Sequence, residues 1–186
     1  NIVTYTRRVS STRRRALDAA VTLIGTEGMR ALTHGRVDAA AGLAPGSTSN
    51  HFRTRAALLQ GVITWIAEEE RGNVHVPQIH SEADFVTAMI HMGELQSGPL
   101  AVRTRARYAL FLDADPDAAA PLLAQRALFE DWTRSMLRSL GGEQAAERTL
   151  FLMAALDGIL LHRITIDPHA PIAEPVRLVV AAALHG

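Results

Sequence analysis

Apolar residues recur at helical spacing along almost the whole 186-residue chain, and this periodicity constrains the fold more than any other feature. Leu17, Val21 and Ile24 fall on one helical face, and similar stripes return as far as the C-terminus. No segment alternates apolar and polar residues as a half-buried strand does. Ala and Leu are abundant, whereas aromatic residues make up only 5% of the chain, and this bias favours helices over sheets. The sequence therefore predicts an all-α fold of roughly nine helices.

Glycine, proline and threonine residues indicate where the N-terminal helices begin and end. A glycine commonly ends a helix, and a proline suits the first helical turn because it has no N–H to lose there. A threonine before an apolar stripe is a good N-cap. Gly28, Gly42, Pro45 and Thr54 accordingly predict four helices, over residues 11–27, 34–41, 45–51 and 54–72.

Beyond residue 72 the expected helices become longer and more apolar. Asp115-Pro116 marks a turn between two of them, and Gly141-Gly142 is expected to break another. One helix should stop before Pro168. The last two helices are predicted over residues 143–166 and 171–185.

Several classes of protein are disfavoured by what the sequence lacks. There is no cysteine, so disulfides, thiol catalysis and cysteine-ligated metals are excluded. No apolar run is long enough to span a membrane, and no signal-peptide pattern is present. The sequence has no Gly-x-Ser-x-Gly, phosphate-loop or His-Glu-x-x-His motif, and its eight histidines lack metal-ligand spacing. We therefore expect neither an enzyme nor a metal or other cofactor, and a cytoplasmic location.

Charge is divided unevenly along a chain whose formal net charge is zero. Residues 1–55 contain nine arginines against three acidic residues, a charge of +6, and the remainder carries −6. Such a division indicates a basic module joined to an acidic one. Cations that contact phosphates release condensed counterions, so a basic module has a physical reason to bind DNA. A solvated basic tail is the alternative interpretation of the charge alone.

The third predicted helix has a composition that suits a partner better than it suits a helix. Ser, Thr and Asn compete for the backbone, and Gly costs about 1 kcal/mol relative to Ala in a helix. Their small hydroxyl and amide groups can instead bond phosphates and base edges in the major groove of DNA. Phe52, directly after this segment, is expected to pin it to the core.

The run over residues 32–59, LTHGRVDAAAGLAPGSTSNHFRTRAALL, resembles the DNA-binding signature of the TetR family of transcriptional regulators. The likeness covers residues 12–60, and several spaced elements match together. It departs from the family pattern at Ser49, where an aromatic residue is usual, at Ala44, where a serine N-cap is usual, and at Arg55, where a lysine is usual. These departures put affinity and sequence preference in doubt.

The resemblance implies a division of labour along the chain. Residues 1–55 would form a helix-turn-helix DNA-binding domain, and residues 56–186 an effector-binding and dimerisation domain. The protein would be a homodimeric repressor, released from a palindromic DNA operator by a small apolar or amphipathic effector. The alternative is a helical ligand-binding or adaptor protein with a degenerate DNA-binding module.

The resemblance also implies roles for particular residues. Three residues at the start of the second helix and one at the start of the fourth would contact phosphates, and the third helix would face the groove. Arg7, Arg8 and Arg13–Arg15 would form a phosphate-binding arm or a disordered tail. The expected DNA-binding residues are Thr33, His34, Arg36, Gly46, Ser47, Thr48, Ser49, Asn50, His51 and Arg55.

In the larger domain, adaptable methionines and aromatic residues could surround an apolar ligand, although such stripes are more often plain core. Asp157 lies on an apolar stripe, so we expect it to bond a ligand, cap a helix or meet Arg163 or His162. The candidate ligand-binding residues are Phe85, Met89, Met92, Tyr108, Phe111, Phe129, Trp132, Met136, Met153 and Asp157. The candidate dimer residues, on the last two helices, are Gly158, Leu161, Val176, Val179 and Val180.

Overall fold

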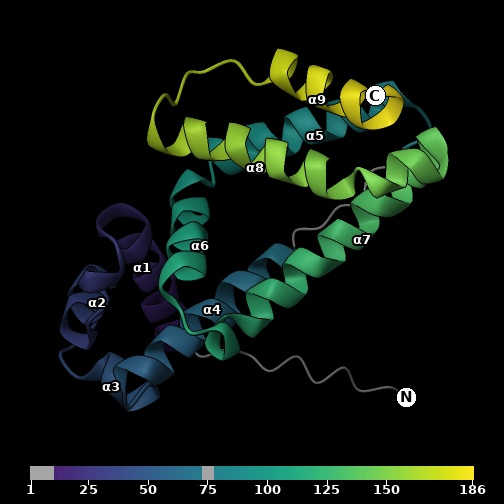
Figure 1. Ribbon diagram of the computed structural model, residues 1–186. Coiled ribbons are helices and arrows are strands. Elements are labelled where there is room, and N and C mark those ends of the chain that lie inside the picture. The colour runs from purple at the N-terminus through teal and green to yellow at the C-terminus, as the bar shows by residue number, and fades with distance from the viewer. Residues whose placement is uncertain (1–10, 73–77) are drawn as a thin grey trace.

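The computed structural model describes residues 11–72 and 78–186, which form nine α-helices and one short 3-10 helix, without a strand among them (Figure 1). The predicted all-α fold is therefore confirmed. In this described part of the chain, no helix has the length and apolar character needed to cross a membrane. The helices are α1 (Ser11–Glu27), η1 (Met29–Ala31), α2 (His34–Ala40), α3 (Ser47–His51), α4 (Arg55–Gly72), α5 (Glu82–Ser97), α6 (Ala101–Asp113), α7 (Pro116–Glu147), α8 (Thr149–Thr165) and α9 (Ala173–His185).

The glycines predicted to end the first two helices do so. Gly28 follows α1 with a φ of 83°, and Gly42 follows α2 with a φ of 60°, a backbone region in which a side chain would be strained. Thr54 caps α4, since its hydroxyl accepts a hydrogen bond of 3.0 Å from the N–H of Ala57. The 3-10 helix η1 was not expected.

Three predicted helix starts are wrong by two residues or more. Helix α9 begins at Ala173 rather than at residue 171. Helix α3 begins at Ser47 rather than at residue 45, because Gly46 adopts a left-handed φ of 87° and places Pro45 in the preceding turn. Helix α8 begins at Thr149 rather than near 143, because α7 kinks at Gly142 and continues to Glu147.

The buried side chains form two hydrophobic cores. The first joins α1, α2, α4, α6 and the start of α7, with Leu17, Leu58 and Leu110 fully buried. The second joins α5, the later part of α7, α8 and α9 around Phe85 and Leu152. The first core therefore continues past residue 55, and α4, α6 and α7 connect the N-terminal helices to the upper layer of α5, α8 and α9 in Figure 1.

Helices α1 and α6 approach each other at the level of the backbone. A Cβ atom added to Gly25 would overlap the carbonyl oxygen of Val102. Only glycine permits this approach without a shift of one helix. The contact sets where α1, and the short helices packed on it, sit on α6.

Candidate functional site

A buried carboxylate holds the turn between α2 and α3. Asp38, near the middle of α2, is 3% exposed. Its Oδ1 accepts hydrogen bonds of 2.7 Å from the Thr48 N–H and 2.5 Å from the Thr48 hydroxyl. Its Oδ2 accepts one of 2.8 Å from the Gly46 N–H. These donors belong to the N-terminus of α3, so α2 supplies the cap that the N-cap residue, Gly46, cannot supply because it has no side chain.

The same contacts fix the charge of Asp38. Burial disfavours the ionised carboxylate, but hydrogen bonds from the Thr48 hydroxyl, the Thr48 N–H and the Gly46 N–H outweigh it. The pKa of Asp38 is consequently lowered from its ordinary value. The cap is therefore an ionised carboxylate at neutral pH.

The position of Thr48 corrects an expectation. Thr48 was predicted to face the DNA groove, but its side chain is fully buried and its hydroxyl is donated to Asp38. It therefore orients α3 from the inside. The sequence holds a signal for this pair, because an aspartate inside an apolar stretch of α2 needs a partner, but Asp38 was not among the expected site residues.

The remaining residues of α3 stay at the surface. The hydroxyl of Ser47 donates to the Ala44 carbonyl at 2.6 Å, and that of Ser49 to the Gly46 carbonyl at 2.8 Å. Both hydroxyls therefore tighten the first turn of the helix. Asn50 and His51 are exposed on the same short helix. Their DNA-binding role stays a prediction.

The residues expected to contact phosphates also hold the N-terminal helices together. Thr33 caps α2, and His34 Nε2 lies 2.6 Å from the Phe52 carbonyl oxygen, to which it donates. Arg36 is exposed and pairs with Glu27 at 2.6 Å. Arg55 is exposed and donates to the carbonyl of Met29 at 2.9 Å.

Three arginines assigned to a possible N-terminal arm belong instead to α1. Arg13 lies over the Phe52 ring, 5.2 Å from its centroid, and Arg15 donates to the carbonyl of Ala41 at 2.6 Å. Arg14 lies over the ring of Trp65. The expected arm is wrong for these residues because they are helical and pack on the module. Arg7 and Arg8 lie outside the described residues.

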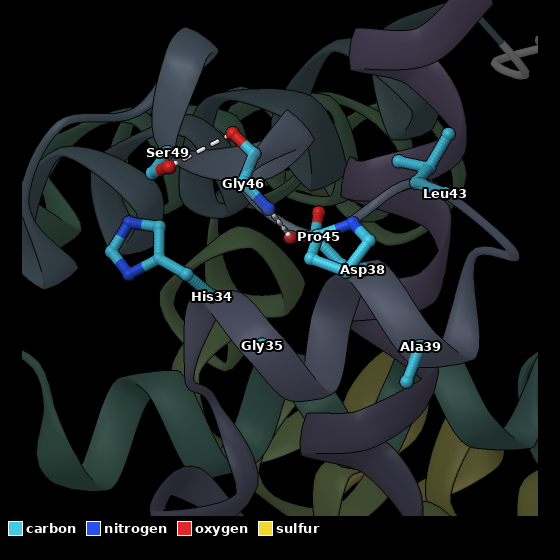
Figure 2. Close-up of a pocket in the computed structure, with 8 residues that line it drawn as sticks. All are labelled: His34, Gly35, Asp38, Ala39, Leu43, Pro45, Gly46 and Ser49. Atoms are coloured by element: carbon cyan, nitrogen blue, oxygen red, sulfur yellow. Dashed lines mark hydrogen bonds between the residues drawn. The ribbon is translucent and has the colours of Figure 1, made fainter.

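A hollow of about 430 Å³ opens between α2 and the start of α3 (Figure 2). Five of its lining residues have only hydrocarbon side chains or none, and three are polar. It is lined by His34, Gly35, Asp38, Ala39, Leu43, Pro45, Gly46 and Ser49.

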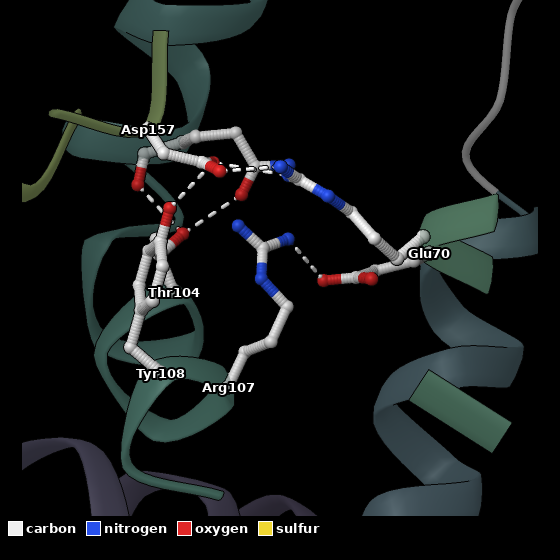
Figure 3. A network of polar contacts seen from close by, with 7 residues as sticks. Glu70, Thr104, Arg107, Tyr108 and Asp157 are labelled. Atoms are coloured by element: carbon white, nitrogen blue, oxygen red, sulfur yellow. Dashed lines mark hydrogen bonds and ion pairs between the residues drawn. The ribbon is translucent and has the colours of Figure 1, made fainter. Parts of the chain in front are cut away.

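In the C-terminal region, a network of charged and polar side chains joins four helices (Figure 3). Glu70 of α4 and Arg107 of α6 form an ion pair at 2.7 Å, and both side chains are mostly buried. The Tyr108 hydroxyl donates to Asp157 of α8 at 2.9 Å. Arg126 of α7 forms a two-armed ion pair with the same carboxylate.

These contacts identify the partners of Asp157. One alternative expected Asp157 to meet Arg163 or His162, and this alternative is wrong. Arg163 donates instead to the Ser97 hydroxyl at 2.9 Å. The pKa of Tyr108 is raised to about 12, first by burial and then by the neighbouring carboxylate. Tyr108 is therefore a neutral hydrogen-bond donor at neutral pH.

Apart from Tyr108 and Asp157, which belong to the polar network, the predicted ligand-binding residues fall into three groups. Phe85, Met89 and Met153 are almost fully buried. Phe111 packs against the first core, 6.4 Å from the Tyr108 ring by centroids. A second hollow, about 710 Å³ between α5 and α9, is lined by none of the ten candidates. The four partly buried residues that pack against the second core are Met92, Phe129, Trp132 and Met136.

Two of the predicted dimer residues are placed elsewhere by the structure. Val176 and Val180 are buried in their own protomer's second core, because that face of α9 packs on α5, α7 and α8. Val179 is partly buried against the same core. Gly158 and Leu161 are exposed on α8.

Helix α8 presents an exposed apolar face that includes these two residues. Leu150 is 74% and Phe151 49% exposed. A Cβ added to Gly158 would meet nothing within 4 Å, so another backbone could approach there. Leu178 on α9 is also largely exposed. Leu150, Phe151 and Leu178 were missed because periodicity alone does not tell which side of a helix its own protomer covers.

Two family models match separate parts of the chain. Residues 16–62 match the family described as bacterial regulatory proteins, tetR family, and residues 80–186 match the tetracyclin repressor-like C-terminal domain. No curated protein gave a significant match.

Solved structures share the fold at low sequence identity. A member of the TetR family from Streptomyces coelicolor A3 is 24% identical with a TM-score of 0.66, over 94% of this chain and 98% of that one. The multidrug binding protein EbrR, complexed with ethidium, is 24% identical with a TM-score of 0.64, over 93% and 98%. A protein from Saccharomonospora viridis, complexed with choline, is 15% identical with a TM-score of 0.71, over 94% and 95%.

Proposed function

The chain belongs to the TetR family of bacterial regulatory proteins, and from this premise we propose that it is a repressor released from a palindromic operator by a small effector. One observation carries the DNA-binding part of the proposal. A short polar helix, α3, is held from behind by Asp38 and Thr48, so that its other side chains stay at the surface of a segment with charge +6. Such a surface suits the phosphates and base edges of a major groove.

We propose that the protein acts as a homodimer through the exposed face of α8. A single helix-turn-helix gives a small interface, and two joined copies raise affinity through effective concentration. The apolar side chains of Leu150, Phe151 and Leu161 would be covered by the same face of a second copy, around Gly158. An operator-binding protein works where DNA lies, so we propose a cytoplasmic location.

The effector is proposed to be an amphipathic molecule that binds within the C-terminal region. Structural neighbours hold organic cations, ethidium in EbrR and choline in the Saccharomonospora viridis protein. In this chain Tyr108, Arg126 and Asp157 offer polar groups, and the Phe111 ring lies 6.4 Å from that of Tyr108. A cationic effector would compete with Arg126 for the Asp157 carboxylate.

The mechanism requires only that the effector binds the DNA-incompetent arrangement of the protein more tightly than the DNA-binding one. An effector that binds the DNA-incompetent arrangement better by about 1–3 kcal/mol changes operator occupancy markedly. An ion pair joins α6 to α4, the Tyr108 hydrogen bond joins α6 to α8, and a second ion pair joins α8 to α7. Helix α6 also contacts α1. A change at Asp157 therefore has a packed route to the helices that carry α3.

DNA binding is the first experiment. The full chain would be titrated against genomic fragments flanking its own gene and against random DNA, over a series of salt concentrations. We expect one fragment to bind far more tightly than random DNA, with log affinity falling by about 0.9 per phosphate contact for each log unit of salt.

Asn50→Ala should relax sequence preference at one position of each half-site while leaving the salt slope unchanged, because Asn50 carries no charge and is exposed on α3. Binding of every fragment no better than random DNA would contradict the proposal. The chain would then be a helical ligand-binding or adaptor protein with a degenerate DNA-binding module.

A further inference from the structure

We propose that the hollow between α2 and α3 receives the 5-methyl group of a thymine in the operator, an inference that rests on the proposed DNA-binding function. The hollow is open to solvent and, at about 430 Å³, has room for the methyl group and the adjoining edge of the pyrimidine. It lies on the two helices of the helix-turn-helix, and Ser49 of α3 is among its lining residues (Figure 2).

The polar groups that line the hollow are already engaged within the protein. The Ser49 hydroxyl donates to the Gly46 carbonyl at 2.8 Å, and His34 Nε2 donates to a carbonyl at 2.6 Å. The Asp38 carboxylate accepts three hydrogen bonds from the start of α3. The Ser49 hydroxyl hydrogen and the His34 Nε2–H are therefore not free to donate to a base edge.

The apolar part of the lining is at the surface. Gly35, Ala39 and Pro45 are exposed. Ala39 and Pro45 have hydrocarbon side chains, and Gly35 has no side chain to fill the space beside it. The thymine methyl is the distinctive apolar group that a base pair offers in the major groove, and small apolar side chains are its usual contacts. The chemistry of the lining therefore favours this group over a hydrogen-bonding base edge.

Charge decides against a phosphate in the same place. The ionised Asp38 carboxylate lines the hollow, and no arginine does. A phosphate would meet a like charge there, whereas a methyl group carries none. Arg36 and Arg55, the two arginines expected to contact phosphates, are exposed and lie outside the hollow.

The test removes the methyl group without changing the base pair. Duplexes are first selected from a random-sequence pool by the full chain, and each thymine of the best duplex is then replaced by deoxyuridine. We expect one position in each half-site at which deoxyuridine weakens binding about fourfold, the value of burying one methyl-sized group.

A pair of matched variants assigns that loss to the hollow. Ala39→Leu fills the hollow, and Ala40→Leu adds the same side chain at the next residue of α2, which is exposed but does not line the hollow. Ala39→Leu should bind the thymine and deoxyuridine duplexes equally, and Ala40→Leu should still distinguish them. Thermal unfolding of both variants would show that they are folded.

The experiment distinguishes failure of the proposed function from failure of the inference alone. A chain that selects no duplex contradicts the proposed function, and the inference with it. A chain that selects a duplex, but shows no loss at any deoxyuridine position, contradicts the inference alone. A loss that persists unchanged in a folded Ala39→Leu variant places the methyl contact elsewhere and also overturns the inference.

Discussion

The DNA-binding module and the C-terminal region use buried polar groups differently. In the module, the Asp38 carboxylate accepts hydrogen bonds only from Gly46 and Thr48, at the start of α3. These two residues lie within about one helical turn of each other. In the C-terminal region, Asp157 and its neighbours join helices whose residues lie far apart in the sequence. The first arrangement fixes one helix in place, whereas the second links several helices that a ligand could shift.

This difference leads to an expectation about energy. A fully buried, fully bonded group stabilises its surroundings more than a partly exposed ion pair does, because solvent screens the latter. Asp38 is 3% exposed, whereas Arg126 and Asp157 keep about a third of their side chains exposed. Substitutions in the two regions should therefore differ in size, and the following predictions test that order.

The largest effect is expected for Asp38→Ala. It leaves the hydroxyl and N–H of Thr48 and the N–H of Gly46 without their acceptor, and should lower the free energy of unfolding by about 3 kcal/mol. Urea unfolding measures this. Thr48→Val in the same chain should recover part of the loss, because one of the stranded donors is then gone. If the losses in the free energy of unfolding caused by Asp38→Ala and Thr48→Val simply add in the double variant, the two side chains are not coupled and the prediction is wrong.

The next largest loss of stability is expected at the contact between α1 and α6, where the two regions meet. Gly25→Ala places a Cβ against the Val102 carbonyl and should destabilise the protein by about 2 kcal/mol, since overpacking forces backbone shifts. Gly35→Ala is the matched control, because a Cβ there meets nothing within 4 Å. Equal unfolding midpoints for the two variants would show that α1 and α6 do not approach as described.

A smaller effect is expected in the polar network. Tyr108→Phe removes one hydrogen bond to Asp157 and should cost about 1 kcal/mol, measured by urea unfolding at pH 7. Because the folded state raises the pKa of Tyr108 to about 12, its contribution is complete below the unfolded value near 10 and is lost as pH rises toward 12.

Absorbance at 295 nm follows this titration directly. The folded chain should show a tyrosine step near pH 12 that Tyr108→Phe abolishes. An alkaline titration in which the variant keeps that step would show that Tyr108 does not occupy the described environment.

The smallest effect on the protomer is expected at Gly158. Gly158→Ala should raise the stability of the helix by up to about 1 kcal/mol, because alanine favours an exposed helix interior and its Cβ has space. If the α8 faces of two copies approach at Gly158, the same change should weaken dimerisation. Sedimentation at several concentrations separates the two effects, and an unchanged dimer constant would place the interface elsewhere.

The sequence predicts the number and class of helices well because apolar periodicity and glycine stops are local properties. The bounds of α1 and the turns at Gly28 and Gly42 are correct for this reason. The start of α3 was placed two residues early, since its N-terminus is set by Asp38, a residue of another helix. Local rules do not identify such a partner.

In the candidate sites, too, local properties were predicted correctly and contacts between helices were not. The resemblance to a family located the DNA-binding segment but placed Thr48 on the wrong side of α3. In the C-terminal region, the polarity of Asp157 indicated that it needed a partner, but Arg126 lies on a helix that sequence spacing does not relate to α8. Which side of α9 is buried likewise depends on three other helices, and so Val176 and Val180 were assigned wrongly.

The cap from Asp38 also bears on how this protein can change its target. Because the carboxylate and Thr48 hold α3 from within, the outward positions 50 and 51 contribute little to keeping the segment helical. Selection can therefore exchange outward side chains, and with them the preferred operator, at small cost in folding. A library that varies these two positions on an intact Asp38–Thr48 pair should yield mostly folded proteins, which makes this module a practical scaffold for new DNA specificities.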